Sequence, residues 1–200
     1  SRRQRQMCIR DRTETMETPK GVPLALCFTD GTPDTREAII AFKGTTGGDE
    51  WSDNVEGAIL RDTPDQIEAL EFVQGLPYAD ITLTGHSKGG NKANYITILC
   101  DKVTRCVGFD PQGFSQLFLN DPKYSKRIEE RASLIKNYSL STDFVHILLY
   151  ELPGAKQIFC KGFGVDSTGQ HHSPNSFFYT DYYGNCLLYT SPSPRDTERS

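Results

Sequence analysis

Residues 81–90 read Ile81-Thr82-Leu83-Thr84-Gly85-His86-Ser87-Lys88-Gly89-Gly90. The apolar, β-branched start of this stretch predicts a strand, and residues 91–100 are compatible with a helix. A Gly-x-Ser-x-Gly pattern between a strand and a helix predicts a nucleophile elbow, a strained turn that exposes the Oγ of Ser87. The two flanking glycines lack a Cβ, which lets the strand and the helix approach each other. The alternative interpretation is a glycine-rich structural turn.

Outside this stretch, predicted strands alternate with predicted helices. A turn cluster at 30–34 joins the first two strands as a hairpin. Thr63 and Pro64 have the positions of an N-cap and a first helical residue. The predicted strands are 24–28, 37–42, 81–84, 103–109, 134–140 and 156–161, and the predicted helices are 64–76, 91–100 and 121–133. This alternation predicts an α/β domain with a mostly parallel central sheet and with no internal repeat.

The two ends of the chain resemble translated adapter DNA from sequencing libraries. Codons for residues 7–12 can be chosen so that their reverse complement encodes residues 186–190, as a single inverted repeat would. We therefore interpret residues 1–12 and 186–200 as non-native segments and exclude them from the fold. Residues 13–185 are then expected to form one domain that is truncated at both ends. The alternative is a basic N-terminal arm and a Ser/Pro-rich tail.

Charge and cysteine content restrict the partners of residues 13–185. Without the two ends, 15 Lys and Arg stand against 23 Asp and Glu, a net charge of −8. This balance disfavours nucleic acids and anionic membrane surfaces as partners. The four cysteines of this range are scattered, without Cys-x-x-Cys spacing, which predicts buried thiols in a reducing compartment, the cytoplasm. No apolar run is long enough to span a membrane.

Serine hydrolysis at Ser87 requires a histidine base and a carboxylate that orients it. On this architecture the acid and then the histidine follow the serine in the chain. His171 and His172 lie in a loop after the last predicted strand, where the base belongs. His146 lies in an apolar stretch and is expected to be a packed side chain. The candidate acids all lie in loops or at the ends of strands; Asp143 is preferred, and the alternatives are Asp110 and Asp166.

The oxyanion requires two N–H donors near the nucleophile. One is expected to be the backbone N–H of Lys88, the residue after Ser87. The second belongs in an earlier strand-to-helix loop, where Gly44-Thr45 lies, so Thr45 is the candidate. A Lys88 side chain acting as the base is disfavoured because histidines are available at the required place. The alternative interpretation is that Gly44–Gly48 is a flexible turn without an oxyanion donor.

Four motifs resemble those of known α/β-hydrolases. Ala41-Phe42-Lys43-Gly44-Thr45, followed by Asp49-Glu50-Trp51, resembles the oxyanion loop of class 3 (fungal-type) lipases. The remaining motifs resemble those of a bacterial lipase-like group of unassigned function. They are Gly85-His86-Ser87-Lys88-Gly89-Gly90-Asn91, Phe109-Asp110-Pro111-Gln112-Gly113-Phe114 and His171-His172-Ser173-Pro174-Asn175-Ser176-Phe177.

The resemblance covers about residues 41–177 and implies an α/β-hydrolase, lipase-like three-layer fold. It places the family's histidine on His172 and implies that Asp143 is the acid. It departs from the pattern at Lys43, where Arg is usual, and at Phe177, where Trp is usual. It implies hydrolysis of a lipid or small-molecule ester, without a metal or an organic cofactor. A non-catalytic binding module and a serine peptidase or acyltransferase remain the alternative functions.

Overall fold

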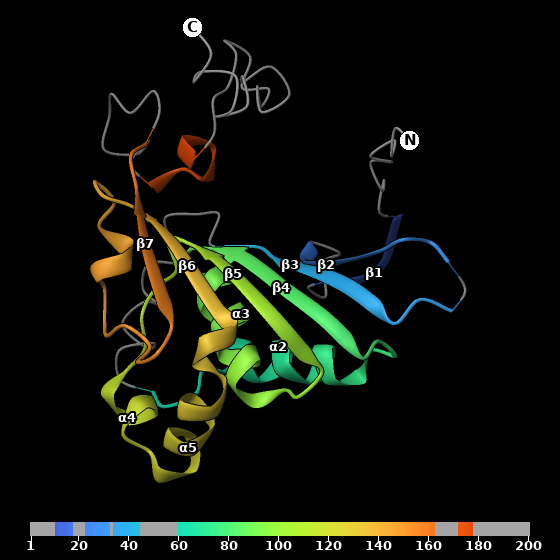
Figure 1. Ribbon diagram of the computed structural model, residues 1–200, viewed down its shortest axis with the longest axis horizontal. Coiled ribbons are helices and arrows are strands. Elements are labelled where there is room, and N and C mark those ends of the chain that lie inside the picture. Colours follow the sequence, from blue (N-terminus) through green and yellow to red (C-terminus); the bar gives the residue numbers. More distant parts are fainter. Residues whose placement is uncertain (1–10, 18–22, 33, 45–59, 163–171, 178–200) are drawn as a thin grey trace, which may run out of the picture.

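The computed structural model describes residues 11–17, 23–32, 34–44, 60–162 and 172–177 (Figure 1). Seven strands form one sheet in which the spatial order of the strands is their order in the chain. The strands are β1 (Asp11–Glu17), β2 (Pro23–Thr29), β3 (Glu37–Phe42), β4 (Asp80–His86), β5 (Val103–Phe109), β6 (Ile135–Leu140) and β7 (Lys156–Cys160). β1, β2 and β3 pair antiparallel, and β3 to β7 pair parallel.

Helices connect the parallel strands. They are α2 (Pro64–Gly75), α3 (Lys88–Leu99), α4 (Gln116–Leu119) and α5 (Pro122–Arg131), with 3₁₀ turns η2 (Ala132–Leu134), η3 (Val145–Ile147) and η5 (Pro174–Phe177). Right-handed crossovers between strands that follow each other in the sheet bring every connecting helix to the same face. Figure 1 shows α2, α3 and α5 together on one side of the sheet. They form one of the two helical layers of the expected fold, and the described residues include no second layer.

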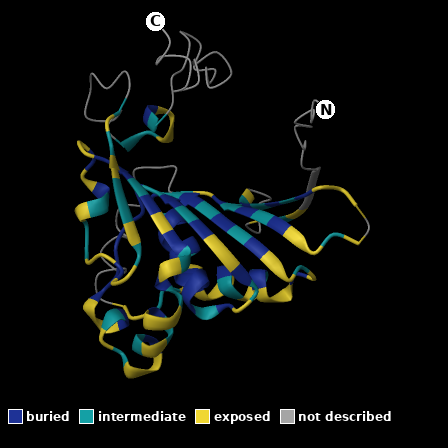
Figure 2. Cartoon of the chain, viewed as in Figure 1, coloured by how far each residue is buried: buried dark blue, intermediate teal, exposed yellow. Residues whose placement is uncertain are grey.

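The core lies between the sheet and α3. Ile81 and Leu83 of β4 face α3 and are fully buried, whereas Thr82 between them is half-buried. Ile96 and Ile98 of α3 are also fully buried. Figure 2 shows the resulting alternation along the strands, with buried residues between half-buried and exposed ones. One face of the sheet is therefore packed on helices, and α3 is fixed rigidly behind the end of β4.

Helix α2 begins as the sequence predicts. The hydroxyl of Thr63 accepts a hydrogen bond from the Gln66 N–H, and the Gln66 side chain accepts one from the Thr63 N–H. Pro64 occupies the first turn, where its missing N–H has no helical partner to lose. This reciprocal capping box satisfies two of the N–H groups that a helix start leaves without a partner.

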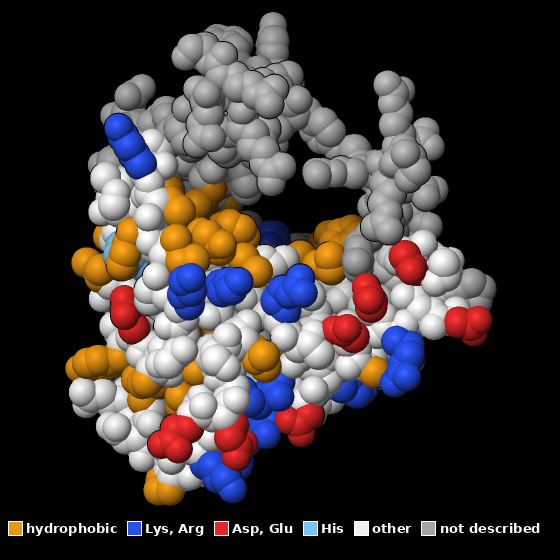
Figure 3. All heavy atoms as spheres, viewed as in Figure 1, with side chains coloured by type: hydrophobic (Ala, Val, Ile, Leu, Met, Phe, Trp, Pro, Cys, Tyr) orange, Lys and Arg blue, Asp and Glu red, His pale blue; other side chains and the backbone are white. Residues whose placement is uncertain are grey.

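The predicted α/β architecture with a mostly parallel sheet is confirmed, and the strand β1 and the short helix α4 were missed. β1 was not predicted, because Asp11–Glu17 consists mainly of polar residues and pairs with β2 through its backbone. It begins within the segment that we interpreted as non-native, so that boundary stays a prediction. Within the described ranges, no helix is long and apolar enough to cross a membrane. Figure 3 shows basic and acidic side chains together on the visible face of the described residues.

Candidate active site

The candidate site lies at the carboxyl ends of the parallel strands. Ser87 follows β4, Asp110 follows β5, and Asp143 lies three residues beyond the end of β6. His172 precedes η5, after the last strand. Parallel strands present their carboxyl ends at one edge of the sheet, where open α/β sheets bind ligands. Residues that are far apart in the chain therefore meet at this edge.

Ser87 has the backbone conformation of a strained elbow. Its φ of 58° and ψ of −127° lie in a region that residues other than glycine rarely adopt. The Ser87 N–H donates to the Phe109 carbonyl at 3.0 Å, and the Ser87 carbonyl accepts from the Asn91 N–H at 3.0 Å. These bonds hold the turn between β5 and the first turn of α3, so the strain is supported from both sides. Ser87 is the N-cap residue of α3 without a side-chain capping bond, which leaves its hydroxyl available.

Gly85 is required where β4 meets α3. A Cβ at Gly85 would lie 2.3 Å from the carbonyl carbon of Gly89. Such a distance is far below any van der Waals contact, so any other residue would push the helix away from the strand. This close approach accompanies the sharp turn of the chain at Ser87, as the motif predicts.

Asp143 and His172 form a hydrogen-bonded pair. His172 Nδ1 lies 3.0 Å from Asp143 Oδ2, and the Phe144 N–H donates to Asp143 Oδ1 at 2.7 Å. The Asp143 side chain is fully buried, whereas 20% of the His172 side chain is exposed. Burial alone would raise the pKa of Asp143, but the His172 hydrogen bond, its charge and the backbone N–H groups lower it below its ordinary value. Asp143 is therefore an anion that fixes the ring of His172.

His86 packs against the same histidine. The ring centroids of His86 and His172 are 4.5 Å apart, with a tilt of 34° between the ring planes. Burial, followed by the neighbouring charge of His172, lowers the pKa of His86 to about 4. A neutral His86 ring adjoins Ser87 in the chain and packs against the His172 ring at a tilt, which places His172 beside the elbow. No hydrogen bond joins Ser87 to His172 in the described part of the chain. Such bonds are often long in free enzymes and shorten when substrate binds.

A cavity of about 240 Å³ opens beside the elbow. Its wall includes Lys88 and Gln112, and the Gln112 N–H lies 3.4 Å from the Ser87 carbonyl oxygen. Further lining comes from the start of α2 and from apolar side chains, among them Leu60, Phe114 and Leu149. The cavity thus adjoins the first turn of α3 and offers a mixed polar and apolar surface, while Ser87, Asp143 and His172 are not among its lining residues.

The other predicted site residues have different outcomes. Thr45, His171 and Asp166 lie outside the described residues. Lys88 begins α3, so its N–H belongs to the first turn of the helix directly after Ser87. His146 is half-buried in η3, with its ring centroid 5.5 Å from that of Phe159.

Sequence reasoning missed the contact of His86 with His172. The available signal was the position of His86 directly before Ser87, because that position places the His86 side chain at the end of β4. Two groups of imidazole and carboxylate atoms lie within 4.8 Å of one another: His86, Asp110 and His172, and Asp110, Asp143 and His146. His172 and Asp143 bind each other, whereas His86 Nε2, Asp110 Oδ2 and His146 Nδ1 are buried without a hydrogen-bond partner among the described residues.

The chain is similar to one protein family and to solved structures of other proteins. The family model described as Mbeg1-like matches residues 4–157. The crystal structure of a predicted CIB-like hydrolase from Thermoplasma acidophilum is similar over 84% of this chain and 94% of that chain, with 16% sequence identity and a TM-score of 0.42. No curated protein matches the sequence.

Proposed function

We propose that this chain, which belongs to the Mbeg1-like family, is a serine-dependent hydrolase of carboxylic esters. The observation that carries the proposal is the buried Asp143–His172 pair, which lies at the same sheet edge as the strained Ser87. An elbow alone is a turn, and a hydrogen-bonded Asp–His pair alone is a structural feature. Their meeting at one edge, in the chain order serine, acid, histidine, is what acyl transfer requires.

The roles follow from the hydrogen bonds. Asp143 binds Nδ1 of His172, so Nε2 is the ring nitrogen that accepts the Ser87 proton. Ser87 Oγ bonds to the ester carbonyl carbon while His172 takes that proton, and the carbonyl oxygen becomes an oxyanion. The carbon–oxygen bond to the leaving alcohol then breaks, and His172 returns the proton to the alcohol. Water repeats the sequence on the acyl-enzyme and releases the carboxylic acid.

The oxyanion donors of this proposal are the N–H groups of Lys88 and Thr45. Gly44, the residue before Thr45, lies against the elbow, because a Cβ at Gly44 would be 3.4 Å from the Cβ of Ser87. The residue that precedes Thr45 in the chain therefore lies beside the proposed nucleophile. The first turn of α3 also directs its N–H groups and the positive end of its dipole toward this place.

Labelling with a fluorophosphonate probe tests the proposal. Fluorophosphonates bond covalently to a serine that is activated by a neighbouring base. We expect the wild-type protein to be labelled at Ser87, and Ser87→Ala to lose both labelling and hydrolysis of p-nitrophenyl acyl esters. Ser133→Ala is the matched control, because Ser133 is exposed in η2 and distant in the fold from the elbow. It should label and hydrolyse like the wild type.

Two results would contradict the proposal. The first is a folded wild-type protein that neither labels nor hydrolyses any ester of a panel of acyl chain lengths, which would favour a binding module. The second is labelling that persists in Ser87→Ala. Cleavage of amides instead of esters by a labelled protein would keep the nucleophile and change the substrate class.

A further inference from the structure

A second buried carboxyl group, that of Asp110, lies at the site. Asp110 directly follows β5 and has a φ of 42°, in the left-handed region. Its Oδ1 accepts a hydrogen bond from the Leu140 N–H at 2.7 Å. Its Oδ2 is fully buried and has no hydrogen-bond partner within the described residues. A buried acceptor without a partner is costly, so this oxygen requires an explanation.

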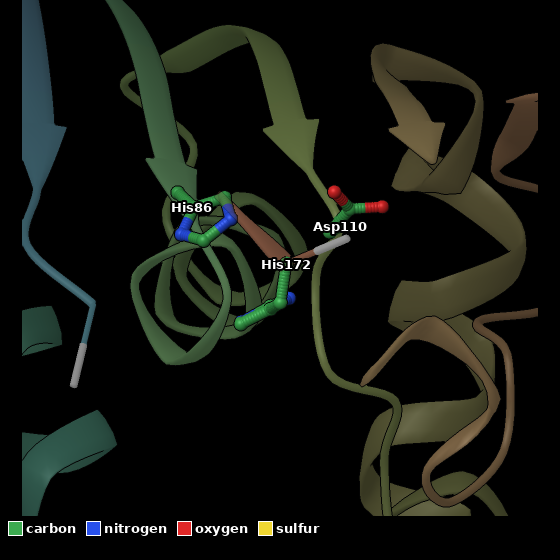
Figure 4. Close-up of side chains that lie close together, drawn as sticks. All are labelled: His86, Asp110 and His172. Atoms are coloured by element: carbon green, nitrogen blue, oxygen red, sulfur yellow. The ribbon is translucent and has the colours of Figure 1, made fainter. Parts of the chain in front are cut away.

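The groups that face Asp110 come from four parts of the fold. An oxygen of Asp110 and ring nitrogens of His86 and His172 lie within 4.8 Å of one another, and Figure 4 shows these three side chains together at the ends of β4 and β5. An oxygen of Asp110 also lies within 4.8 Å of an Asp143 oxygen and a His146 nitrogen. His86, Asp143, His146 and His172 are thus the titratable groups around Asp110.

Two buried carboxyl groups this close cannot both ionise at low cost. Asp143 has the better support for a negative charge, since it accepts from both His172 and the Phe144 N–H. Asp110 accepts one N–H and has a bare Oδ2. Burial first, and then the charge of Asp143, raises the pKa of Asp110 to about 8, against the lowering effect of the Leu140 N–H. The proton therefore belongs on Asp110.

We infer that Asp110 is a positioning residue whose carboxyl group stays neutral beside ionised Asp143, with the proton on Oδ2 directed at the Asp143 carboxylate. This inference rests on the proposed function. A neutral Asp110 leaves Asp143 as the single negative charge that holds the Nδ1–H of His172, and it donates to Asp143 without competing for His172. The proton stays on Asp110 throughout turnover. Asp110 therefore takes no part in the bond-making and bond-breaking steps of the acyl transfer.

Loss of this proton should disturb the site. Ionised Asp110 would repel Asp143 and offer His172 a second carboxylate, so the ring would lose its single orientation. The rate should therefore fall as Asp110 titrates. Asparagine reproduces the neutral acid, because its carbonyl can accept from Leu140 and its amide N–H can donate to Asp143. Asparagine also tolerates the positive φ at this position.

The experiment compares the pH profiles of kcat/KM for wild type, Asp110→Asn, Asp110→Ala and the control Asp101→Asn. Asp101 is an exposed carboxylate paired with Arg127. Wild type and Asp101→Asn should lose activity between about pH 7 and 9. Asp110→Asn should keep its activity at pH 7 within about threefold and lose this alkaline fall. Asp110→Ala, which lacks the donor, should be about tenfold less active at pH 7.

Either of two results overturns the inference. If Asp110→Asn is as inactive at pH 7 as Asp143→Asn, then Asp110 acts as an anion. If the alkaline fall is unchanged in Asp110→Asn, then Asp110 does not titrate there. Activity of the wild type and labelling at Ser87 in the same preparations report on the proposed function separately.

Infrared difference spectroscopy tests the proton without catalysis. The wild-type protein at pH 7 should show the carbonyl band of a buried carboxylic acid, which should disappear as the pH rises to about 10. Asp101→Asn should keep this band and Asp110→Asn should lack it. Absence of the band in the wild type would overturn the inference even if Asp110→Asn does not fold.

Discussion

The neutral carboxyl of Asp110 predicts a measurable change in how stability depends on pH. In the unfolded chain this group has its ordinary pKa of 3.8, and burial raises the pKa to about 8 in the folded protein. A raised pKa gives stability that is fully present below pH 3.8 and is lost as the pH rises through 8. Between about pH 5 and 7 the folded state holds one proton that the unfolded state has released.

One proton difference corresponds to a slope of about −1.4 kcal/mol per pH unit in the free energy of unfolding. From pH 5 to pH 7 the contribution of Asp110 therefore falls by about 3 kcal/mol. The slope depends only on the difference in the number of bound protons between the folded and unfolded states. It therefore has the same value for any folded-state pKa well above 7. The Asp110→Asn variant lacks this titrating proton. Its free energy of unfolding should therefore fall by about 3 kcal/mol less than that of the wild type between pH 5 and pH 7.

Urea unfolding followed by far-ultraviolet circular dichroism at pH 5, 6 and 7 measures this slope. All other groups titrate in both proteins, so the difference between wild type and Asp110→Asn isolates one side chain. Asp101→Asn is the control. A hydrogen bond and the charge of Arg127 lower the pKa of Asp101, so this group is ionised in both states above pH 5 and its line should run parallel to wild type. Parallel lines for Asp110→Asn and wild type would refute the assignment of the proton to Asp110.

Three further changes have expected outcomes. Asp143→Asn should lower kcat by about 10³- to 10⁴-fold with little change in KM, because the histidine loses its fixed tautomer; a loss below about tenfold in steady-state kinetics would contradict its role as the triad acid. Gly44→Ala introduces a Cβ 2.6 Å from a backbone carbonyl oxygen at the elbow. We expect it to lower the free energy of unfolding, measured by thermal unfolding, by about 1–3 kcal/mol. Gly75→Ala is the control and should not destabilise the protein, because a Cβ at Gly75 meets nothing within 4 Å. Mass-spectrometric mapping after brief alkylation should find Cys160 modified well before Cys106, because burial raises the pKa of Cys106 to about 12; equal rates would show that the core opens.

Local patterns were sufficient for the elements that carry the elbow. The apolar run before Gly85 predicted β4, and the Thr63-Pro64 pair predicted the start of α2, because each signal lies within one element. The helix after Ser87 begins at Lys88, earlier than the Asn91 that its composition suggested. Lys-Gly-Gly is a poor helix start by propensity, and the close packing of glycine backbones against β4 overrides that preference.

The environment of the acid was not predictable in the same way. The sequence favoured Asp143 because it follows a predicted strand and precedes the histidine loop, and the family resemblance implied the same residue; Asp110 and Asp166 stayed as alternatives. Which carboxyl group carries the charge depends on the N–H and imidazole donors that the fold brings to each, and these come from separate strands and loops. Such a meeting has no signature in a single sequence, because it depends on the register of β5 and β6.

The sheet order explains why the two carboxyl groups meet and why their roles divide. β5 and β6 are adjacent and parallel, so the residues that follow them emerge side by side, and the Asp110 N–H donates to the Tyr138 carbonyl at 2.8 Å. Neighbouring strand ends thus bring two acids to one histidine. A site with two charges would repel itself, and a site with one acid would leave the buried Leu140 N–H without its acceptor. A neutral Asp110 accepts the Leu140 N–H, and the negative charge stays on Asp143. The position of a single proton therefore gives the two carboxyl groups different roles.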